Sequence, residues 1–357
     1  MDKSRVLLGN VHIMMAYAFR CPERASPAEA APQEFDHLHD LLAHIIAEEA
    51  SRQVRRGLHH EYVLQSEELR TVRGRINVTS TMSRQPVHRG TVVCEYDEFL
   101  PDTAHNRAVK AVILMLARHH DVARNRRRAL TRLLPYFSSV RRVPVSAVRW
   151  DQLRLQRMNA SYRWLLGACE LAARGQLPGH SPGTSGLPWK HTEKMSTLFE
   201  NFVKEYFRFH HPDLKPRSAY VGWDLGGRRD VGKQQLPRMR TDITLRGPDE
   251  SLIIDTKLYA ESMSYGQYDK ASLRSDHLYQ IHAYVQNASA ASPQPVSGLL
   301  LYARTDGPIQ PELDVEIGGH RIGATTIDLS RPWPHVQAQL EAVLDRFPSR
   351  GGNPDLS

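Results

Sequence analysis

The sequence predicts an α/β protein with two domains: an α+β N-terminal domain and a C-terminal domain built on a central mixed sheet flanked by helices. Three observations support this. The length of 357 residues suits two domains. Some segments place apolar side chains at helical spacing, whereas others alternate like strands. Residues 175–188 hold four glycines and three prolines, which is typical of a linker. We therefore expect domains at 1–174 and 189–347, and a disordered tail at 348–357.

Composition narrows the class of protein. The chain is 41% hydrophobic and 24% charged, which is ordinary for a globular protein with a core. No apolar run approaches the length of a membrane span, and the charged N-terminus is unlike a signal peptide. Three widely separated cysteines, Cys21, Cys94 and Cys169, form no zinc-ribbon or disulfide pattern. We expect a reduced, cytoplasmic protein.

Positive charge is concentrated in one stretch. The net charge is +8, and residues 118–163 hold twelve arginines against only Asp121 and Asp151, with no lysine. Two interpretations stay open. The stretch is a solvated helical face, or it is a surface that contacts phosphates or an acidic partner.

In the first domain, a short helix is expected at 10–20 with Asn10 as its N-cap, and a second from Phe35 to Arg56 that ends at Gly57. Strand-like segments then predict a small antiparallel sheet or partial barrel; they lie at 61–64, 69–72, 75–78 and 91–99. Helices are expected at 102–117, through the arginine-dense stretch, and at 152–173, with breaks at Pro135 and Pro144.

In the second domain, helix and strand patterns alternate, which predicts an α/β arrangement. Helical segments are expected at 194–210, 277–286 and 334–347, and strands at 219–223, 241–245, 251–257, 298–303 and 322–329. The segment 261–274 is polar and is expected to be mobile. Gly227 to Lys233 nearly matches a phosphate-binding loop, but Gln234 stands where a hydroxyl is needed, so we expect no bound nucleotide.

The most informative stretch is the expected hairpin at 241–257. Asp242 lies in its first strand, and the apolar second strand ends in Asp255, Thr256 and Lys257. Because side chains alternate along a strand, Asp255 and Lys257 point to the same face. Two carboxylates and the Thr256 carbonyl are oxygen ligands of the kind Mg²⁺ takes, with Mn²⁺ as a substitute. A nearby lysine can orient water or stabilise a phosphoryl transition state.

Flanking helices offer further groups. Glu200 lies on the helix before the hairpin, either on a solvated face or in the site. Gln280 and Tyr284 lie one turn apart on the helix that follows it, where they either pack or support the site. The motif Asp-x-Lys alone is common, so the combination carries the prediction.

With these residues in view, the sequence resembles the PD-(D/E)xK nuclease superfamily, in the branch with a Gln-x-x-x-Tyr motif. It is more closely similar to the McrC family, the nuclease subunits of McrBC systems that restrict DNA containing 5-methylcytosine. The similarity extends to N-terminal segments, and thus over nearly the whole chain; these segments are 10–19, 55–58, 73–76 and 106–107.

The resemblance implies a restriction-endonuclease-like C-terminal domain that cuts double-stranded DNA with Mg²⁺. It implies that the N-terminal domain docks on a hexameric AAA+ GTPase ring and stimulates its GTPase. Asp242 and Asp255 would bind metal, Lys257 and Glu200 would join them in catalysis, and four residues would contact DNA or support the site: Gln280, Tyr284, Arg238 and Arg240. Arg73 and Arg75 are candidates for contact with the ring. Two alternatives stay open: a stand-alone repair-type nuclease, and a non-catalytic DNA-binding scaffold.

Overall fold

The computed structural model of the chain describes residues 3–25, 35, 37–84, 90–153, 155, 157–174, 193–226, 231–258, 263–265 and 271–346. The chain divides into two compact units. The sheet unit combines Met1–Asp36 with Gly175–Ser357, and the helical unit is His37–Arg174. The expected linker at 175–188, the tail at 348–357 and Gly227 of the loop-like segment lie outside the described residues.

The N-terminal segment differs from the prediction, which placed residues 1–174 together. Helix α1 (Lys3–Ala18) packs on α7 (Glu193–His210) of the sheet unit. The ring of Tyr17 meets that of Tyr206 edge to face, with centroids 5.3 Å apart. Asn10 lies inside the helix and is not its N-cap. Its amide donates to the carbonyls of Leu329 and Arg331 at 2.7 Å each. These contacts tie α1 to the sheet unit.

The sheet unit has a five-stranded mixed sheet in the order β11-β12-β10-β7-β6. Strand β10 is parallel to both β7 and β12, and the edge strands β6 and β11 are antiparallel to their neighbours. The strands of this sheet are β6 (Ile243–Arg246), β7 (Ser251–Lys257), β10 (Val296–Ala303), β11 (Leu313–Ile317) and β12 (His320–Ile327). This confirms the predicted mixed sheet flanked by helices.

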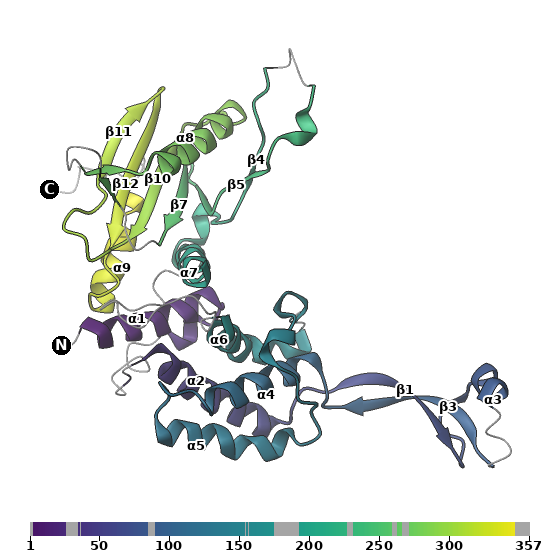
Figure 1. The fold of residues 1–357 in the computed structure, drawn as a ribbon. Helices are drawn as coiled ribbons and strands as arrows, with labels where there is room; N and C mark the ends of the chain where they lie inside the picture. Colours follow the sequence, from purple (N-terminus) through teal and green to yellow (C-terminus); the bar gives the residue numbers. More distant parts are fainter. Residues whose placement is uncertain are drawn as a thin grey trace. The chain divides into compact units, whose positions relative to one another are not determined.

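Helices and two small ribbons complete the unit. The helices are α1, α7, α8 (Ser275–Ala290) and α9 (Trp333–Glu341), and the ribbons pair β4 (Tyr220–Val221) with β5 (Met239–Arg240) and β8 (Met263–Tyr265) with β9 (Ala271–Leu273). Helix α8 covers one face of the sheet (Figure 1) and buries Ile281 and Val285 against Ile253 and Leu300. Within the segment 261–274, which the sequence predicted to be polar and mobile, the described residues include β8 and β9.

The helical unit packs four helices together: α2 (Leu38–Arg56), α4 (Ala104–Leu116), α5 (Arg124–Leu133) and α6 (Arg163–Arg174). Helix α2 ends at Gly57, whose φ of +90° suits glycine. Thr103 caps α4 by accepting the backbone N–H of Asn106. Helix α6 is shorter than the predicted 152–173, because 3-10 turns occupy the described residues before it.

A long antiparallel ribbon, here called the arm, extends from these helices (Figure 1). It pairs β1 (Glu61–Leu69) with β3 (Val92–Leu100), and it carries β2 (Arg75–Ile76) and α3 (Val78–Arg84). Of the two expected forms, the small antiparallel sheet is confirmed and the partial barrel is not, because the strand order is open, β1-β3-β2. Nothing in the described part of the chain forms a helix both long enough and apolar enough to cross a membrane.

Candidate active site

The β6–β7 hairpin brings Asp242 and Asp255 to neighbouring strands. Asp242 immediately precedes β6, and Ile243 pairs with Ile254, so Asp242 lies next to the end of β7. Thr256 fixes the Asp242 carboxylate twice, because its backbone N–H and its hydroxyl both donate to Oδ2 at 2.8 Å. The other oxygen, Oδ1, takes no hydrogen bond from the described residues. Asp242 is therefore oriented with one oxygen left for a ligand.

Asp255 is buried, with only 1% of its surface exposed. Lys257 Nζ lies 2.6 Å from Asp255 Oδ2 as an ion pair. Burial raises the pKa of Asp255 to about 6, against the opposing effect of Lys257, and the charge of Asp242 adds to the rise. The site therefore holds a buried carboxylate that lacks sufficient positive charge around it.

Lys257 is held from the other side by helix α8. Gln280 Oε1 accepts a hydrogen bond from Lys257 Nζ at 2.8 Å, and Gln280 Nε2 donates to Tyr284 Oη at 3.0 Å. The helical spacing of Gln280 and Tyr284 places them on one face, as the sequence predicted. The structure thus brings four of the expected residues into one chain of contacts: Asp255, Lys257, Gln280 and Tyr284.

Glu200 approaches the same carboxylates from helix α7. Burial raises its pKa, the nearby charge of Asp242 adds to the rise, and Lys204, 3.5 Å from Glu200 Oε1, opposes it. Its charge also contributes to the raised pKa of Asp255. Glu200 therefore lies within electrostatic range of both aspartates, and it is only partly exposed. Three carboxylates at one sheet edge repel one another unless a cation joins them.

The donor set fits a divalent metal ion. Asp255 offers a buried carboxylate, Asp242 offers Oδ1, which accepts no hydrogen bond from the described residues, and carboxylate oxygens are hard donors of the kind that Mg²⁺ prefers. Whether the Thr256 carbonyl joins them stays a prediction.

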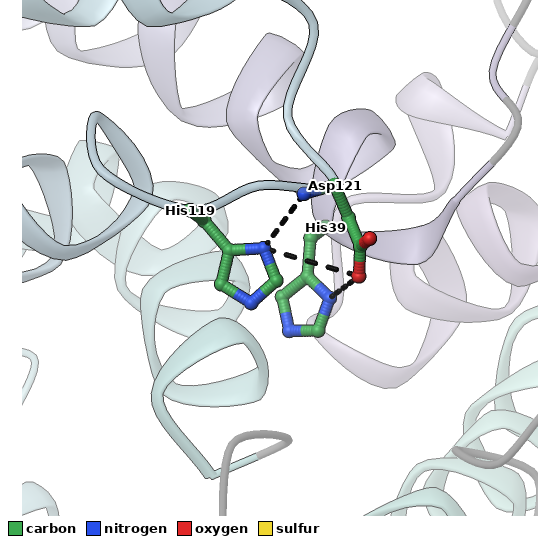
Figure 2. A group of neighbouring side chains, drawn as sticks. All are labelled: His39, His119 and Asp121. Atoms are coloured by element: carbon green, nitrogen blue, oxygen red, sulfur yellow. Dashed lines mark hydrogen bonds and ion pairs between the residues drawn. The ribbon is translucent and has the colours of Figure 1, made fainter. Parts of the chain in front are cut away.

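Two tighter groups, each with three ligand atoms within 4.8 Å of one another, lie in the helical unit; they are His39, His119 and Asp121, and His59, Glu61 and His105. Figure 2 shows the first group. Each of its imidazole Nδ1 atoms lies 3.9 Å from Asp121 Oδ2. The backbone N–H of Asp121 already donates to His119 Nδ1 at 3.2 Å. Both groups lie in the helical unit, whereas Asp242, Asp255 and Glu200 lie in the sheet unit. Neither group therefore belongs to the site formed by these carboxylates.

The four arginines named from the sequence have different surroundings. Arg240 is exposed on β5, 6.0 Å from the ring centroid of Tyr220, and its charge lowers the pKa of Glu200, so it lies near the site. Arg238 is exposed and immediately precedes β5. On the arm, the Arg73 guanidinium lies 3.9 Å from the Tyr96 ring centroid, and Arg75 pairs with Glu95 at 2.5 Å.

Sequence reasoning missed three supporting groups. Ser218 Oγ donates to the carbonyl of Asp242 at 2.8 Å, and Lys204 Nζ lies 3.3 Å from the same Oγ. Burial, with the nearby charge of Lys257 adding to its effect, lowers the pKa of His277 to about 4, and its Nδ1 lies 2.9 Å from Tyr302 Oη. His277 lies one turn before Gln280, and Lys204 lies one turn after Glu200. This helical spacing could have identified both residues. Nothing local signalled Ser218.

Known proteins resemble this chain over most of its length. The model of the family described as McrBC 5-methylcytosine restriction system component matches residues 5–303. A Type IV methyl-directed restriction enzyme of Escherichia coli (strain K12), EcoKMcrBC, is 26% identical over 352 residues, which are 97% of this chain and 99% of that protein. A solved half-complex of Thermococcus gammatolerans McrB AAA+ hexamers with bound McrC matches at 15% identity with a TM-score of 0.50, covering 94% of this chain and 76% of that one.

Proposed function

The chain belongs to the family of McrBC 5-methylcytosine restriction system components, and from this premise we propose that it is the DNA-cutting subunit of such a system. It hydrolyses phosphodiester bonds of double-stranded DNA with Mg²⁺, or with Mn²⁺ in its place. It does so when docked on a hexameric AAA+ GTPase ring, whose GTP hydrolysis it stimulates.

One observation carries the catalytic part of this proposal. The ammonium of Lys257 lies 2.6 Å from the buried carboxylate of Asp255 and 2.8 Å from Gln280 Oε1. Lysine is long and flexible, and burying it costs free energy unless its charge is used. Here it is fixed beside a carboxylate whose pKa is raised to about 6. Perturbed groups that converge in this way mark functional sites more often than structural ones.

Each side chain then has a role. Asp242 and Asp255 bind the metal ion, and Thr256 holds Asp242 in the orientation for doing so. A bound Mg²⁺ supplies positive charge at the scissile phosphate and lowers the pKa of its water. Lys257 stabilises the negative charge that develops on the phosphate, and Gln280 keeps its ammonium in place. Glu200 holds or receives a proton at the edge of the site, since its pKa is raised.

The arm is the proposed docking element for the ring. Its apolar side chains are exposed although they pair across the strands: Tyr62 is 73% exposed and Phe99 53%, with ring centroids 4.9 Å apart. Leu64 is 62% exposed. Exposed apolar groups on a polar ribbon are typical of an interaction surface. Arg73 and Arg75 flank this surface and are proposed to contact the ring as well.

The decisive experiment reconstitutes the full chain with the AAA+ GTPase of the same system, GTP, Mg²⁺ and DNA containing 5-methylcytosine. Asp255→Asn and Lys257→Ala are each expected to lower cleavage at least 100-fold, because each removes a group from the reacting centre. The matched control is Asp249→Asn, which removes a carboxylate from the exposed turn of the same hairpin and is expected to cut normally.

Other outcomes are equally clear. If Asp255→Asn cuts as well as the unaltered chain, the site assignment is wrong. Efficient cutting by the purified chain without ring or GTP would instead identify a stand-alone nuclease. Calorimetric titration with Mg²⁺ that shows no binding dependent on Asp242 would indicate a non-catalytic scaffold.

A further inference from the structure

Helix α5 carries an unusual set of positions on one face. Residues at spacings of three and four along a helix share a face, and on α5 five such positions hold four arginines and one threonine; they are Arg124, Arg127, Arg128, Thr131 and Arg132. The opposite side buries Leu130 and Leu133. We call the five positions the arginine face. It accounts for a third of the twelve arginines between 118 and 163.

The guanidinium groups of this face lack partners among the described residues. None of the four forms an ion pair or a side-chain hydrogen bond with a described residue, and the Nε of Arg127 is buried without a hydrogen bond. Arg126 of the same helix points elsewhere and donates to the buried carboxylate of Asp40. The chain therefore pairs its inward arginine and leaves four others unpaired. Like charges at these spacings destabilise a helix, so the arrangement has a cost that an anion would relieve.

The face is also hollowed. A groove of about 600 Å³ is lined by the five residues of the arginine face together with Ala117. A concave surface lined by several positive charges, one of which also holds a buried donor without a partner, suits an anion. Arginine presents its donors in a planar fork that matches two oxygens of a phosphate.

The lining favours a nucleic-acid backbone over a protein partner. Protein interfaces have an apolar core with aromatic or large aliphatic anchors. Here the groove offers only Ala117 and Thr131 besides the arginines. The ten residues of α5 span about 15 Å, so the charges form a row along the helix. A row of arginines without apolar anchors or base-reading amides suits a polymer with regularly spaced phosphates.

We propose that the arginine face of α5 binds the phosphate backbone of duplex DNA. This is a second DNA contact, in the helical unit, that is separate from the cutting site and independent of base sequence. Binding can be measured in EDTA without cleavage, so its failure and that of the proposed nuclease activity are distinguishable.

The test uses the full chain, a fluorescently labelled duplex, EDTA and a series of salt concentrations, with affinity read by anisotropy. The variant is Arg124→Gln/Arg128→Gln/Arg132→Gln, since glutamine keeps the helix propensity and length of the side chain. Losing three phosphate contacts lowers the slope of log affinity against log salt by about 3. Raising the salt from about 50 to 200 mM therefore weakens DNA binding by the variant about 40-fold less than it weakens binding by the unaltered chain. The variant should also melt at a higher temperature than the unaltered chain in the absence of DNA.

The matched control removes three charges from the same unit outside the face: Arg141→Gln/Arg142→Gln/Arg149→Gln. These arginines are exposed. The proposal is supported if this control keeps the slope of the unaltered chain. It is overturned if the control lowers the slope as much as the α5 variant, because net charge alone would then explain binding. It is also overturned if the α5 variant binds DNA normally but no longer binds the GTPase ring, since the face would then dock a protein.

Discussion

Thr256 and Gln280 explain how a lysine and an aspartate can lie side by side in a buried place without losing their orientation. Thr256 alternates away from Asp255 and Lys257 along β7, yet its N–H and hydroxyl both reach Asp242. Gln280 reaches Lys257 from α8. Thr256, the uncharged residue of the motif, thus positions Asp242, the proposed metal ligand, and Gln280 of α8 positions the ammonium of Lys257. Groups that support a reacting set in this way commonly decide its activity.

Replacing Gln280 should separate positioning from chemistry. Gln280→Leu removes the acceptor of the Lys257 hydrogen bond, so cleavage by the reconstituted complex should fall about 10- to 100-fold. Gln280→Glu keeps an oxygen at that place and should recover much of the rate. Tyr284→Phe, which loses only the contact to Gln280, should have a smaller effect. Equal rates for Gln280→Leu and the unaltered chain would show that Lys257 needs no such support.

Asp255 should make the stability of the metal-free chain depend on pH. Its pKa is raised to about 6 in the folded chain, so folding strengthens proton binding. The stabilisation is complete below the ordinary pKa of the carboxyl and is lost as pH rises through about 6. Between about pH 5 and pH 7.5 the unaltered chain should therefore lose about 1 kcal/mol relative to Asp255→Asn.

Thermal melts of both proteins in EDTA at the two pH values measure this difference. Adding Mg²⁺ at pH 7.5 should raise the melting temperature of the unaltered chain, since the ion replaces the proton as the partner of Asp255, and should leave Asp255→Asn unchanged. If the difference in stability between the two proteins does not vary with pH, the pKa of Asp255 is not raised in the folded chain.

Helix α8 and strand β10 set the distance between Gln280 and the sheet. Gly298 of β10 lies directly under α8. A Cβ added there would come within 2.7 Å of Val285 Cγ2 and 2.8 Å of Ile281 Cγ1. Both contacts are with buried, branched side chains, which have little room to move. The glycine is therefore needed for the close approach of helix and sheet, and the position of Gln280 depends on it.

Gly298→Ala should test this dependence. The added methyl group overpacks the layer and should destabilise the sheet unit by about 1–3 kcal/mol. If the helix moves outward instead, Gln280 moves away from Lys257, and cleavage falls more than stability does. Chemical denaturation and cleavage rates of the same preparation separate the two effects. Gly222→Ala is the matched control, because a Cβ there meets nothing within 4 Å; it should alter neither.

Across the whole molecule, sequence patterns predicted those elements that depend on residues close together in the chain. The hairpin was predictable because turn residues and alternation fix both of its strands, and Asp255 and Lys257 lie on one face as expected. The packing partner of α1 was not predictable, since helical spacing shows that a face is buried but not against what. The arm was predicted as a small antiparallel sheet or a partial barrel, and the sequence could not decide between them, because exposed strands with apolar residues such as Tyr62 and Phe99 look like buried ones. Contacts between distant segments, such as Ser218 with Asp242, leave no local pattern.

The division into two units predicts that cutting and docking can be lost separately. The carboxylates lie in the sheet unit and the arm in the helical unit, and substitutions without shared contacts act independently. Asp255→Asn should therefore abolish cleavage but stimulate the GTPase of the ring as the unaltered chain does. Tyr62→Ala/Phe99→Ala removes the exposed aromatic pair of the arm; it should lower GTPase stimulation at least 10-fold and keep Mg²⁺ binding by calorimetry. A chain with both changes should lose both activities. If Asp255→Asn also abolished stimulation, the two activities would be one coupled function, and the arm alone would not account for docking.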